Sequence, residues 1–257
     1  MDPYFRVEVI SQTPNPQRTA WLAAHQDYSE GFVWDEWQKQ LDDVDYSHGG
    51  IEFYDSKFTE EYCGEMIVKH LLAGHRGHFG PLEHPQIVLN AGWFPHSTMQ
   101  QLRTHRHLSF DCQSGRYTGK RIVQVVENKR DIEEVFYFRP LGQYTDRNGK
   151  KYEYTANLKR QDIEWCRAAC AIYADRIDDG FSEEHARSMI PFDIRQHWVV
   201  SMNLRSLMHI LAVRGKRDAQ LECQQFCELV LPHFKAWTPQ VYEWFEQNLW
   251  LKARLAP

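Results

Sequence analysis

Apolar residues recur three and four positions apart along much of the chain, which is the spacing of an amphipathic helix. The clearest run begins after Thr59, a suitable N-cap, continues through Tyr62, Met66 and Leu71, and ends at Gly74. The same pattern predicts helices near 18–23, just after Pro95, and over 158–179, 182–190, 203–214, 218–234 and 238–250.

Short runs rich in β-branched and aromatic residues predict strands between these helices. They cover residues 86–94, 122–126, 135–138, 152–154 and 198–201, and a turn at 147–150 favours an antiparallel hairpin. Strands and helices do not alternate regularly, which argues against a doubly wound fold. We therefore expect an α+β fold, a mostly antiparallel sheet flanked by helices, forming a single domain over residues 1–257.

Composition narrows the possible functions. Hydrophobic residues make up 42% of the chain, which excludes a disordered protein. The net charge is −5, which argues against a nucleic-acid polymer as partner. Residues 103–130 nevertheless contain seven Lys or Arg against two acidic residues, so an anionic ligand is expected there. No apolar stretch reaches the roughly 20 residues that span a bilayer, and MDPYFRVEVI is no signal peptide, so we expect a cytoplasmic protein without a membrane partner. The six cysteines are expected to be reduced.

The most polar segment is RTHRHLSFDCQSGRY, from Arg103 to Tyr117. Guanidinium groups that cannot reach water keep their charge and need anionic or carbonyl partners, so such a cluster favours a site for phosphates or carboxylates. The alternative is a set of surface salt bridges on a solvated helix end, which are common and individually weak.

The spacing inside this segment resembles the signature of the flavin-dependent thymidylate synthases. In that family RHR is followed by seven residues and a serine, with GRY completing the pattern, and here Thr104-His105-Arg106 precedes Ser114 at the same distance. Thr104 stands where the family has arginine, and Arg103 is placed to reach part of the same space. Four further segments are similar to the family, namely Gly77–His84, Gln101, Arg187 with the following Met189-Ile190-Pro191, and Asn203–Arg214.

The resemblance implies a thymidylate synthase-like fold and an enzyme that converts dUMP to dTMP. Methylenetetrahydrofolate would donate the one-carbon unit, and NADPH would supply reducing equivalents through bound FAD. It further implies a homotetramer with sites shared between subunits.

The resemblance also assigns residues to each ligand. For dUMP it assigns Gln101, Arg103, Thr104, Cys112, Gln113, Ser114, Gly115, Arg116, Arg187 and Arg214. For FAD it assigns His78, Gly80, Thr104, His105, Arg106, Cys112, Asn203, Leu204, Arg205 and His209. Arg214 is the predicted catalytic residue, because a fixed positive charge beside the pyrimidine carbonyls favours negative charge on the ring.

Histidines suggest a rival enzyme class, a metal-dependent hydrolase. Seven of the thirteen lie between His70 and His107, and His105 and His107 have the alternate spacing that some zinc enzymes use. Against this class, HExxH and CxxC are absent, and Arg106 between the two histidines opposes a dication. We therefore expect no metal.

Two other patterns remain open. Two pairs of cysteines are each one helical turn apart, Cys166 with Cys170 and Cys223 with Cys227. Together they would suit a four-thiolate zinc site, although small apolar cysteines on helix faces are commoner. Ser114 lies in no G-x-S-x-G elbow, so it is interpreted as a nucleotide ligand rather than a nucleophile. A non-catalytic nucleotide-binding protein is the third functional class.

Overall fold

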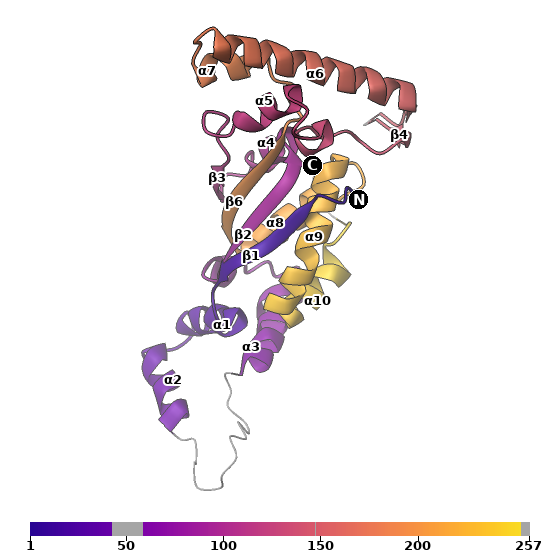
Figure 1. Ribbon diagram of the computed structural model, residues 1–257. Helices are drawn as coiled ribbons and strands as arrows, with labels where there is room; N and C mark the ends of the chain where they lie inside the picture. Colours follow the sequence, from indigo (N-terminus) through magenta and orange to yellow (C-terminus); the bar gives the residue numbers. More distant parts are fainter. Residues whose placement is uncertain (43–58, 147, 253–257) are drawn as a thin grey trace, which may run out of the picture. The chain divides into compact units, whose positions relative to one another are not determined.

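The computed structural model describes residues 1–42, 59–146 and 148–252 (Figure 1). Four strands form one sheet in the order β1-β2-β6-β3, and two more form the antiparallel hairpin β4-β5. Their bounds are β1 Arg6–Gln12, β2 Gln86–Pro95, β3 Ser109–Cys112, β4 Gly142–Thr145, β5 Lys151–Tyr154 and β6 Arg195–Asn203. With the helices that flank the sheet, this arrangement confirms the predicted α+β class.

Helices account for most of the remaining described chain. They are α1 Pro16–Gln26, α2 Val33–Asp42, α3 Glu60–Ile67, α4 His96–Leu102, α5 Lys120–Val126, α6 Ala156–Asp178, α7 Glu183–Ala186, α8 Leu204–Arg214, α9 Leu221–Trp237 and α10 Pro239–Asn248. Shorter turns of helix include a π-helical turn at Val68–Leu72 and 3-10 turns at Gly80–Glu83 and Arg187–Met189. Within the described ranges, no helix is both long and apolar enough to cross a membrane.

The chain divides into two compact units. The first contains Met1–Glu8, Leu89–Val200 and Arg217–Phe226, and the second contains the other described residues. The single domain over residues 1–257 stays a prediction.

Several helices begin at or next to the residues predicted to start them, and their side chains cap the first turn. The Thr59 hydroxyl accepts a hydrogen bond from the Tyr62 N–H at 3.2 Å, and the Asn203 side chain accepts one from the Ser206 N–H at 2.8 Å. Ser182 caps α7 in the same way. Each cap satisfies an N–H that the first helical turn leaves without a partner, so these starts are encoded locally.

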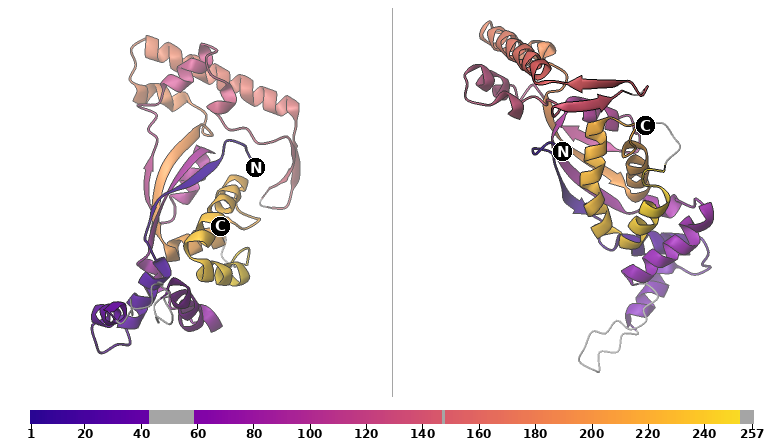
Figure 2. Two further views of the ribbon diagram at one scale, coloured as in Figure 1. Left: turned by 60° about the horizontal axis from the view of Figure 1, so that its bottom comes forward. Right: turned by 90° about the vertical axis from the view of Figure 1, so that its right-hand side faces the viewer.

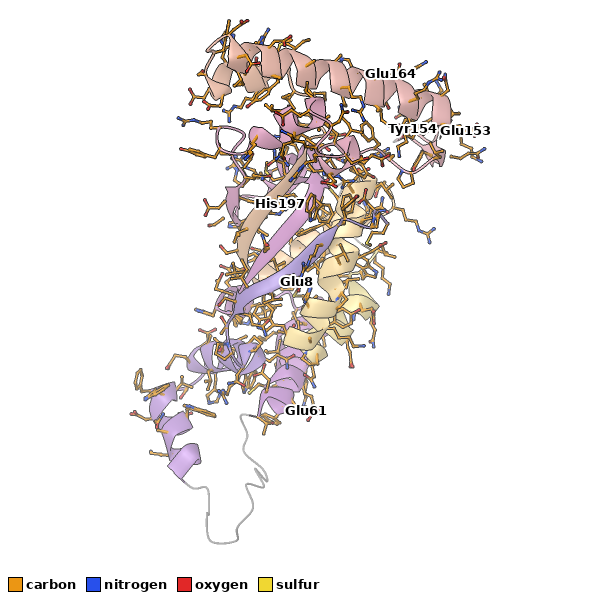
Figure 3. All side chains as sticks on the ribbon, in the orientation of Figure 1. Glu8, Glu61, Glu153, Tyr154, Glu164 and His197 are labelled. Carbon is orange, nitrogen blue, oxygen red and sulfur yellow. The ribbon has the colours of Figure 1, made fainter. Side chains whose placement is uncertain are left out.

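Residues 122–126 were predicted as a strand, and this prediction is wrong because they belong to helix α5. Ile122 and Val125 are 2% and 1% exposed, whereas Val126 is 42% exposed, which is a helical rather than an alternating pattern. The buried face packs with Cys166 and Cys170 of α6, and the neighbouring Glu164 of α6 is exposed (Figure 3). Burial against a long helix therefore outweighs the strand propensity of the β-branched residues.

The predicted strand over residues 135–138 is also wrong. This segment is irregular and makes a single antiparallel bridge, between Phe136 and Ile194. All four residues are buried, so their apolar character reflects the core rather than a ladder of backbone hydrogen bonds.

The predicted hairpin is confirmed, with Gly142 opposite Tyr154 in its register. Arg147 of the predicted turn lies outside the described residues. The Asp146 carboxylate accepts the N–H groups of Asn148 and Lys150, both at 2.8 Å, which closes the turn. The second strand leads directly into α6 (Figure 2).

Within the second unit, a buried glutamine joins three helices. The Gln17 amide of α1 donates to the Glu60 carbonyl at 3.1 Å and to the Gln240 side chain at 2.7 Å, and it accepts from the Val241 N–H at 3.2 Å. A Cβ at Gly64 of α3 would lie 2.6 Å from this amide, so only glycine leaves room for it.

Candidate functional site

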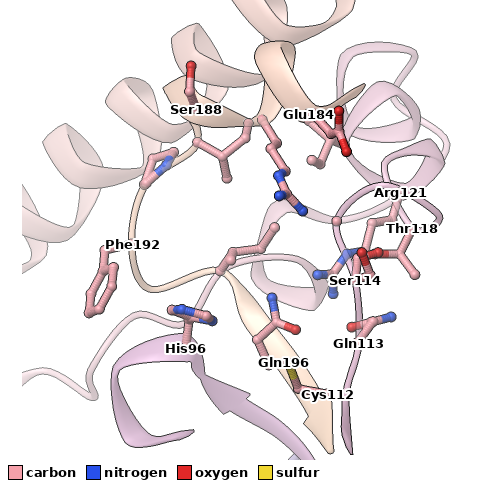
Figure 4. Close-up of a pocket in the computed structure, with 16 residues that line it drawn as sticks. His96, Cys112, Gln113, Ser114, Thr118, Arg121, Glu184, Ser188, Phe192 and Gln196 are labelled. Atoms are coloured by element: carbon pink, nitrogen blue, oxygen red, sulfur yellow. The ribbon is translucent and has the colours of Figure 1, made fainter. Parts of the chain in front are cut away.

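A pocket of about 520 Å³ lies in the first unit, where the end of β3 faces the α7 region and the start of β6 (Figure 4). Its wall consists of His96, Cys112, Gln113, Ser114, Gly115, Thr118, Arg121, Ile122, Glu184, Arg187, Ser188, Ile190, Pro191, Phe192, Ile194 and Gln196. The structure thus brings Cys112–Gly115 of the central motif together with Arg187, which lies 72 residues after Gly115 along the chain.

Backbone hydrogen bonds shape the motif into a turn at the pocket. The Gln113 N–H donates to the His197 carbonyl at 2.9 Å and holds the end of β3 against β6. The Ser114 carbonyl then accepts the Tyr117 N–H at 3.1 Å and the Thr118 hydroxyl at 3.0 Å. These bonds leave the serine hydroxyl and the glycine backbone beside the cavity.

Gly115 lies directly against Arg187. A Cβ added at Gly115 would be 3.3 Å from Cδ and 3.9 Å from Nη1 of Arg187, which is tight contact. A glycine here therefore allows the arginine side chain to lie on the turn, and the guanidinium and the backbone N–H groups can act on one anion.

Arg116 forms an ion pair with an acidic residue of the pocket wall. Its Nε donates to the Glu184 carboxylate at 2.9 Å, and both side chains are about half exposed, at 51% and 54%. An exposed ion pair of this kind is worth little, so a substrate anion can displace Glu184 from Arg116 at small cost. The dUMP role of Arg116 stays a prediction.

Five of the predicted dUMP residues are not part of the pocket wall, and three of them lie at the end of α4. The Gln101 amide donates to the Gln220 side chain at 2.6 Å, the Thr104 hydroxyl donates to the Gln101 carbonyl at 2.7 Å, and Arg103 is exposed at the end of α4. His105 and Arg106, predicted for FAD, follow in the same turn. Their ligand roles stay predictions.

Several polar residues of the wall were not predicted as nucleotide ligands, above all His96, Arg121 and Gln196. Arg121 and Gln196 are buried, at 8% and 6% exposure. The strand prediction for 122–126 hid the helix in which both Arg121 and Ile122 line the pocket. Gln196 lies in the part of β6 that precedes the predicted strand, so no sequence signal indicated it.

Burial and positive charge both disfavour protonation of the histidines near this pocket. Burial lowers the pKa of His96, and Arg103 lowers it further while Asp193 opposes the change. Burial and then Arg121 lower the pKa of His197. Both imidazoles are therefore neutral at pH 7, and the cationic groups of the pocket are its arginines.

Two of the segments predicted for FAD lie together in the second unit. Arg205 of α8 is paired with Glu83, and its guanidinium lies 5.9 Å from the centre of the Phe79 ring, close to Gly80 and His78 in the chain. The Leu204 N–H donates to the Pro85 carbonyl at 3.0 Å, which fixes the start of α8 against the same segment. An exposed guanidinium can bind phosphate groups, and an aromatic ring beside it can pack against a ring of the ligand. The pair therefore suits a cofactor that carries both phosphates and aromatic rings.

The remaining predicted residues of this unit lie on or next to α8. Asn203 uses its side-chain oxygen to cap the helix, Leu204 is buried, His209 is exposed, and Arg214 is half-buried in the last turn. The exposed polar positions Arg205 and His209 are four residues apart, so they share one helix face, as the sequence predicted. Their contacts with FAD and the catalytic role of Arg214 stay predictions.

The two metal alternatives involve histidine and cysteine side chains. Across the described residues, no group of three or more His, Cys, Asp and Glu side chains is arranged to hold a metal ion. None of the six cysteines, all of which lie in the described ranges, forms a disulfide, and five are buried. Burial raises the pKa of Cys166 to about 12 and that of Cys170 to about 11, so both thiols are neutral at pH 7.

Comparisons with known proteins identify the family. Residues 8–240 match the family described as thymidylate synthase complementing protein. A flavin-dependent thymidylate synthase from Haloarcula marismortui is 30% identical over 261 residues, covering 98% of this chain and 99% of the relative. One from Halobacterium salinarum is 30% identical over 258 residues, covering 98% of this chain and 100% of the relative.

Solved structures share the fold. Thymidylate synthase X from Helicobacter pylori, crystallised with FAD and dUMP, covers 97% of this chain with a TM-score of 0.65 and 18% identity, and 100% of that chain is covered. The UMP/dUMP methylase PolB from Streptomyces cacaoi, bound with 5-Br dUMP, covers 98% of this chain and 97% of its own with a TM-score of 0.68 and 19% identity. Because the family match and the curated relatives span nearly the whole sequence, this chain belongs to the flavin-dependent thymidylate synthase family, as the segment from Thr104 to Tyr117 predicted.

Proposed function

We propose that this enzyme transfers the methylene group of methylenetetrahydrofolate to C5 of dUMP and reduces it to the methyl group of dTMP, with NADPH as the source of electrons. In the overall reaction, one NADPH and one proton are consumed, and tetrahydrofolate and NADP⁺ are released. The observation that carries the proposal is the pocket in which the family motif, Cys112–Gly115, meets Arg187. This pocket offers a serine hydroxyl, a glycine turn and an arginine to one anionic nucleotide.

Within this proposal, the residues of the first unit hold dUMP. Arg187 and the Ser114-Gly115 turn bind the phosphate, and Arg116 leaves Glu184 to join them. Gln101 and Arg103 orient the nucleotide, and Thr104, Cys112 and Gln113 complete its contacts. Fixing the nucleotide in this way positions C5 for reaction and accounts for part of the rate enhancement.

Arg214 acts on the uracil ring in this proposal. Its positive charge beside the carbonyl oxygens stabilises negative charge that develops on the ring, including loss of the N3 proton, and this makes C5 more nucleophilic. No protein nucleophile is required for that activation.

Bound FAD would supply the hydride that reduces the transferred carbon, since flavins accept electrons from NADPH and donate hydride. Residues from both units are proposed to hold it. In the second unit they are Arg205 and His209, with His78, Gly80, Asn203 and Leu204. In the first unit they are Thr104, His105, Arg106 and Cys112. Their guanidinium and imidazole groups and the helix N-terminus at Asn203 suit the phosphates of such a cofactor.

The decisive experiment is a single-turnover assay under anaerobic conditions. Purified enzyme is reduced with NADPH, mixed with dUMP and methylenetetrahydrofolate, and quenched for separation of the nucleotides. Formation of dTMP supports the proposal. A protein that binds dUMP but neither oxidises NADPH nor forms dTMP would instead be the non-catalytic nucleotide-binding protein.

Two substitutions test the assigned roles. Arg214→Ala should abolish dTMP formation and leave the visible spectrum of bound flavin nearly unchanged, whereas Arg217→Ala, which removes an exposed arginine nearby in the sequence, should retain activity. Normal dTMP yield in the Arg214 variant would contradict its catalytic role. Arg187→Ala should mainly weaken dUMP binding, measured by quenching of flavin fluorescence, with the exposed Arg167→Ala as control.

We also propose that the enzyme is a cytoplasmic homotetramer with active sites shared between subunits. Light scattering coupled to gel filtration measures the mass directly. A monomer that is fully active at the concentration of the assay would contradict shared sites.

A further inference from the structure

Arg121 is a cation in the pocket wall to which neither the motif nor the predicted roles assign a function. It lies in the first turn of α5 and is 8% exposed. Its Nη1 donates to the Arg195 carbonyl at 2.8 Å, but its buried Nε–H has no hydrogen-bond acceptor among the described residues. In Figure 4, the Arg121 guanidinium and the Gln196 amide point into the same part of the pocket.

The wall around Arg121 shares this incomplete hydrogen bonding. Gln196 Oε1, Gln113 Oε1 and His96 Nδ1 are also buried without a partner in the described chain, and all three residues line the pocket. Buried polar groups in folded proteins are nearly always paired. Four such groups around one cavity indicate that the wall is built to bind a polar ligand.

The charge of Arg121 specifies what kind of ligand. Burial, and then the nearby Arg130, lower the pKa of Arg121 to about 10, so it remains a cation at neutral pH while the protein offsets its charge poorly. Glu184 is the carboxylate of the pocket wall, and it is paired with Arg116. An anion from outside the chain would satisfy Arg121 best.

We propose that Arg121 is a second cation of the pocket wall for the 5′-phosphate of the nucleotide, acting with Arg187, and with Arg116 once it leaves Glu184, to bind the phosphate as its dianion. Arg187 lies on Gly115 in the same pocket, and the guanidinium groups of the wall suit the double negative charge that a phosphate monoester carries above its second pKa of about 6. This inference rests on the proposed function for the identity of the nucleotide. It adds a phosphate-binding residue that lies outside the motif and the other segments of family resemblance.

The test separates phosphate recognition from general damage to the pocket. Dissociation constants for dUMP and for deoxyuridine, which lacks the phosphate, are measured by calorimetry for the native enzyme, for Arg121→Gln and for Lys120→Gln. Lys120 is the adjacent, exposed cation of α5 and is not part of the wall, so it is the matched control. Loss of a charged hydrogen bond predicts that the preference for dUMP over deoxyuridine falls roughly tenfold or more in Arg121→Gln and stays unchanged in Lys120→Gln.

The outcomes of this comparison differ for the two proposals. If the native enzyme binds dUMP in preference to deoxyuridine and Arg121→Gln keeps that preference, the role of Arg121 is wrong and the proposed function stands. If Arg121→Gln weakens both ligands equally, Arg121 has only a structural role and the inference also fails. If the native enzyme does not bind dUMP, the proposed function itself fails.

A second measurement applies if Arg121→Gln does not fold. In the native enzyme labelled with ¹⁵N-arginine, the Nε–H signal of Arg121 is assigned as the one absent from Arg121→Lys. It should shift when dUMP is added and remain in place with deoxyuridine. A signal that dUMP leaves unmoved overturns the inference.

Discussion

The ion pair between Arg139 and Glu222 provides a quantitative test of how the first unit is held together. Glu222 is 1% exposed, and its carboxylate accepts hydrogen bonds from Arg139 Nε at 2.8 Å and Nη2 at 3.2 Å. Burial by itself raises the pKa of Glu222, but the hydrogen bonds and charge of Arg139 outweigh it and lower the pKa overall. The carboxylate is therefore ionised at pH 7, and its charge depends on Arg139.

Arg139→Met removes the cation and leaves the carboxylate buried. The Gln220 amide, which donates to Glu222 at 2.7 Å, cannot replace a full positive charge. Loss of one partner from a buried pair costs about 3–5 kcal/mol, a large part of the 5–15 kcal/mol that is typical of folded proteins. For a chain of this length, that corresponds to a fall in melting temperature of roughly 10 °C.

The assay is urea denaturation at pH 7, followed by tryptophan fluorescence, with Arg139→Met/Glu222→Gln as the matched control. The double variant has no charge at positions 139 and 222 and should recover most of the lost free energy of unfolding. If Arg139→Met costs less than about 1 kcal/mol, or if the double variant is as unstable as the single one, the reasoning is refuted.

The pH dependence gives an independent check on the same pair. In the native protein the lowered pKa of Glu222 contributes stability above its unfolded pKa of about 4.3, and this stability is lost as the pH falls through the folded pKa. In Arg139→Met, burial without the arginine raises the folded pKa of Glu222 above 4.3, so folding favours proton uptake. The deficit of the variant should therefore be largest at pH 7 and shrink as the pH is lowered toward 4.

Three further predictions concern the pocket and its surroundings. Gly119→Ala should destabilise the protein by about 1–3 kcal/mol in thermal melts, because its Cβ would lie 1.9 Å from the Tyr173 hydroxyl, and Tyr173→Phe should rescue part of the loss. Iodoacetamide should label Cys112, the exposed cysteine among six, as read by peptide mass spectrometry, and dUMP should slow the reaction where deoxyadenosine does not. His197 should titrate below its usual pKa by NMR, because burial and then Arg121 lower its pKa. The neutral imidazole therefore favours folding above about pH 6.5, and this contribution to stability is lost as the pH falls toward the folded pKa. Removing the charge of Arg121 should raise the pKa of His197.

The helix starts show what a sequence reports reliably. Thr59, Ser182 and Asn203 each cap a helix through a side-chain oxygen that reaches an N–H three residues ahead, so the information lies within one turn. The central motif was likewise found because its polar residues, from Arg103 to Tyr117, lie in one contiguous segment. Its partner Arg187 was found through the resemblance, since a lone arginine between a short helix and a proline carries no signal of its own.

Residues that join the pocket through tertiary contacts were beyond the reach of sequence patterns. His96 and Gln196 line the wall because the backbone at the start of α4 bonds to Ile194 and because β6 lies next to β3 in the sheet. Strand order and register are properties of the folded sheet, and no spacing along a single strand reveals its neighbour.

The error at residues 122–126 and the omission of Arg121 have the same cause. In a strand, Arg121 and Ile122 would point to opposite faces, and an arginine beside an apolar residue would be interpreted as solvent-exposed. In the helix, Arg121 and Ile122 both line the pocket, while Ile122 and Val125 also pack into the core shared with α6. The packing of α5 on α6 thus determines both the secondary structure of this segment and the presence of a buried cation in the pocket, so a substitution in that core should alter nucleotide binding without touching the nucleotide.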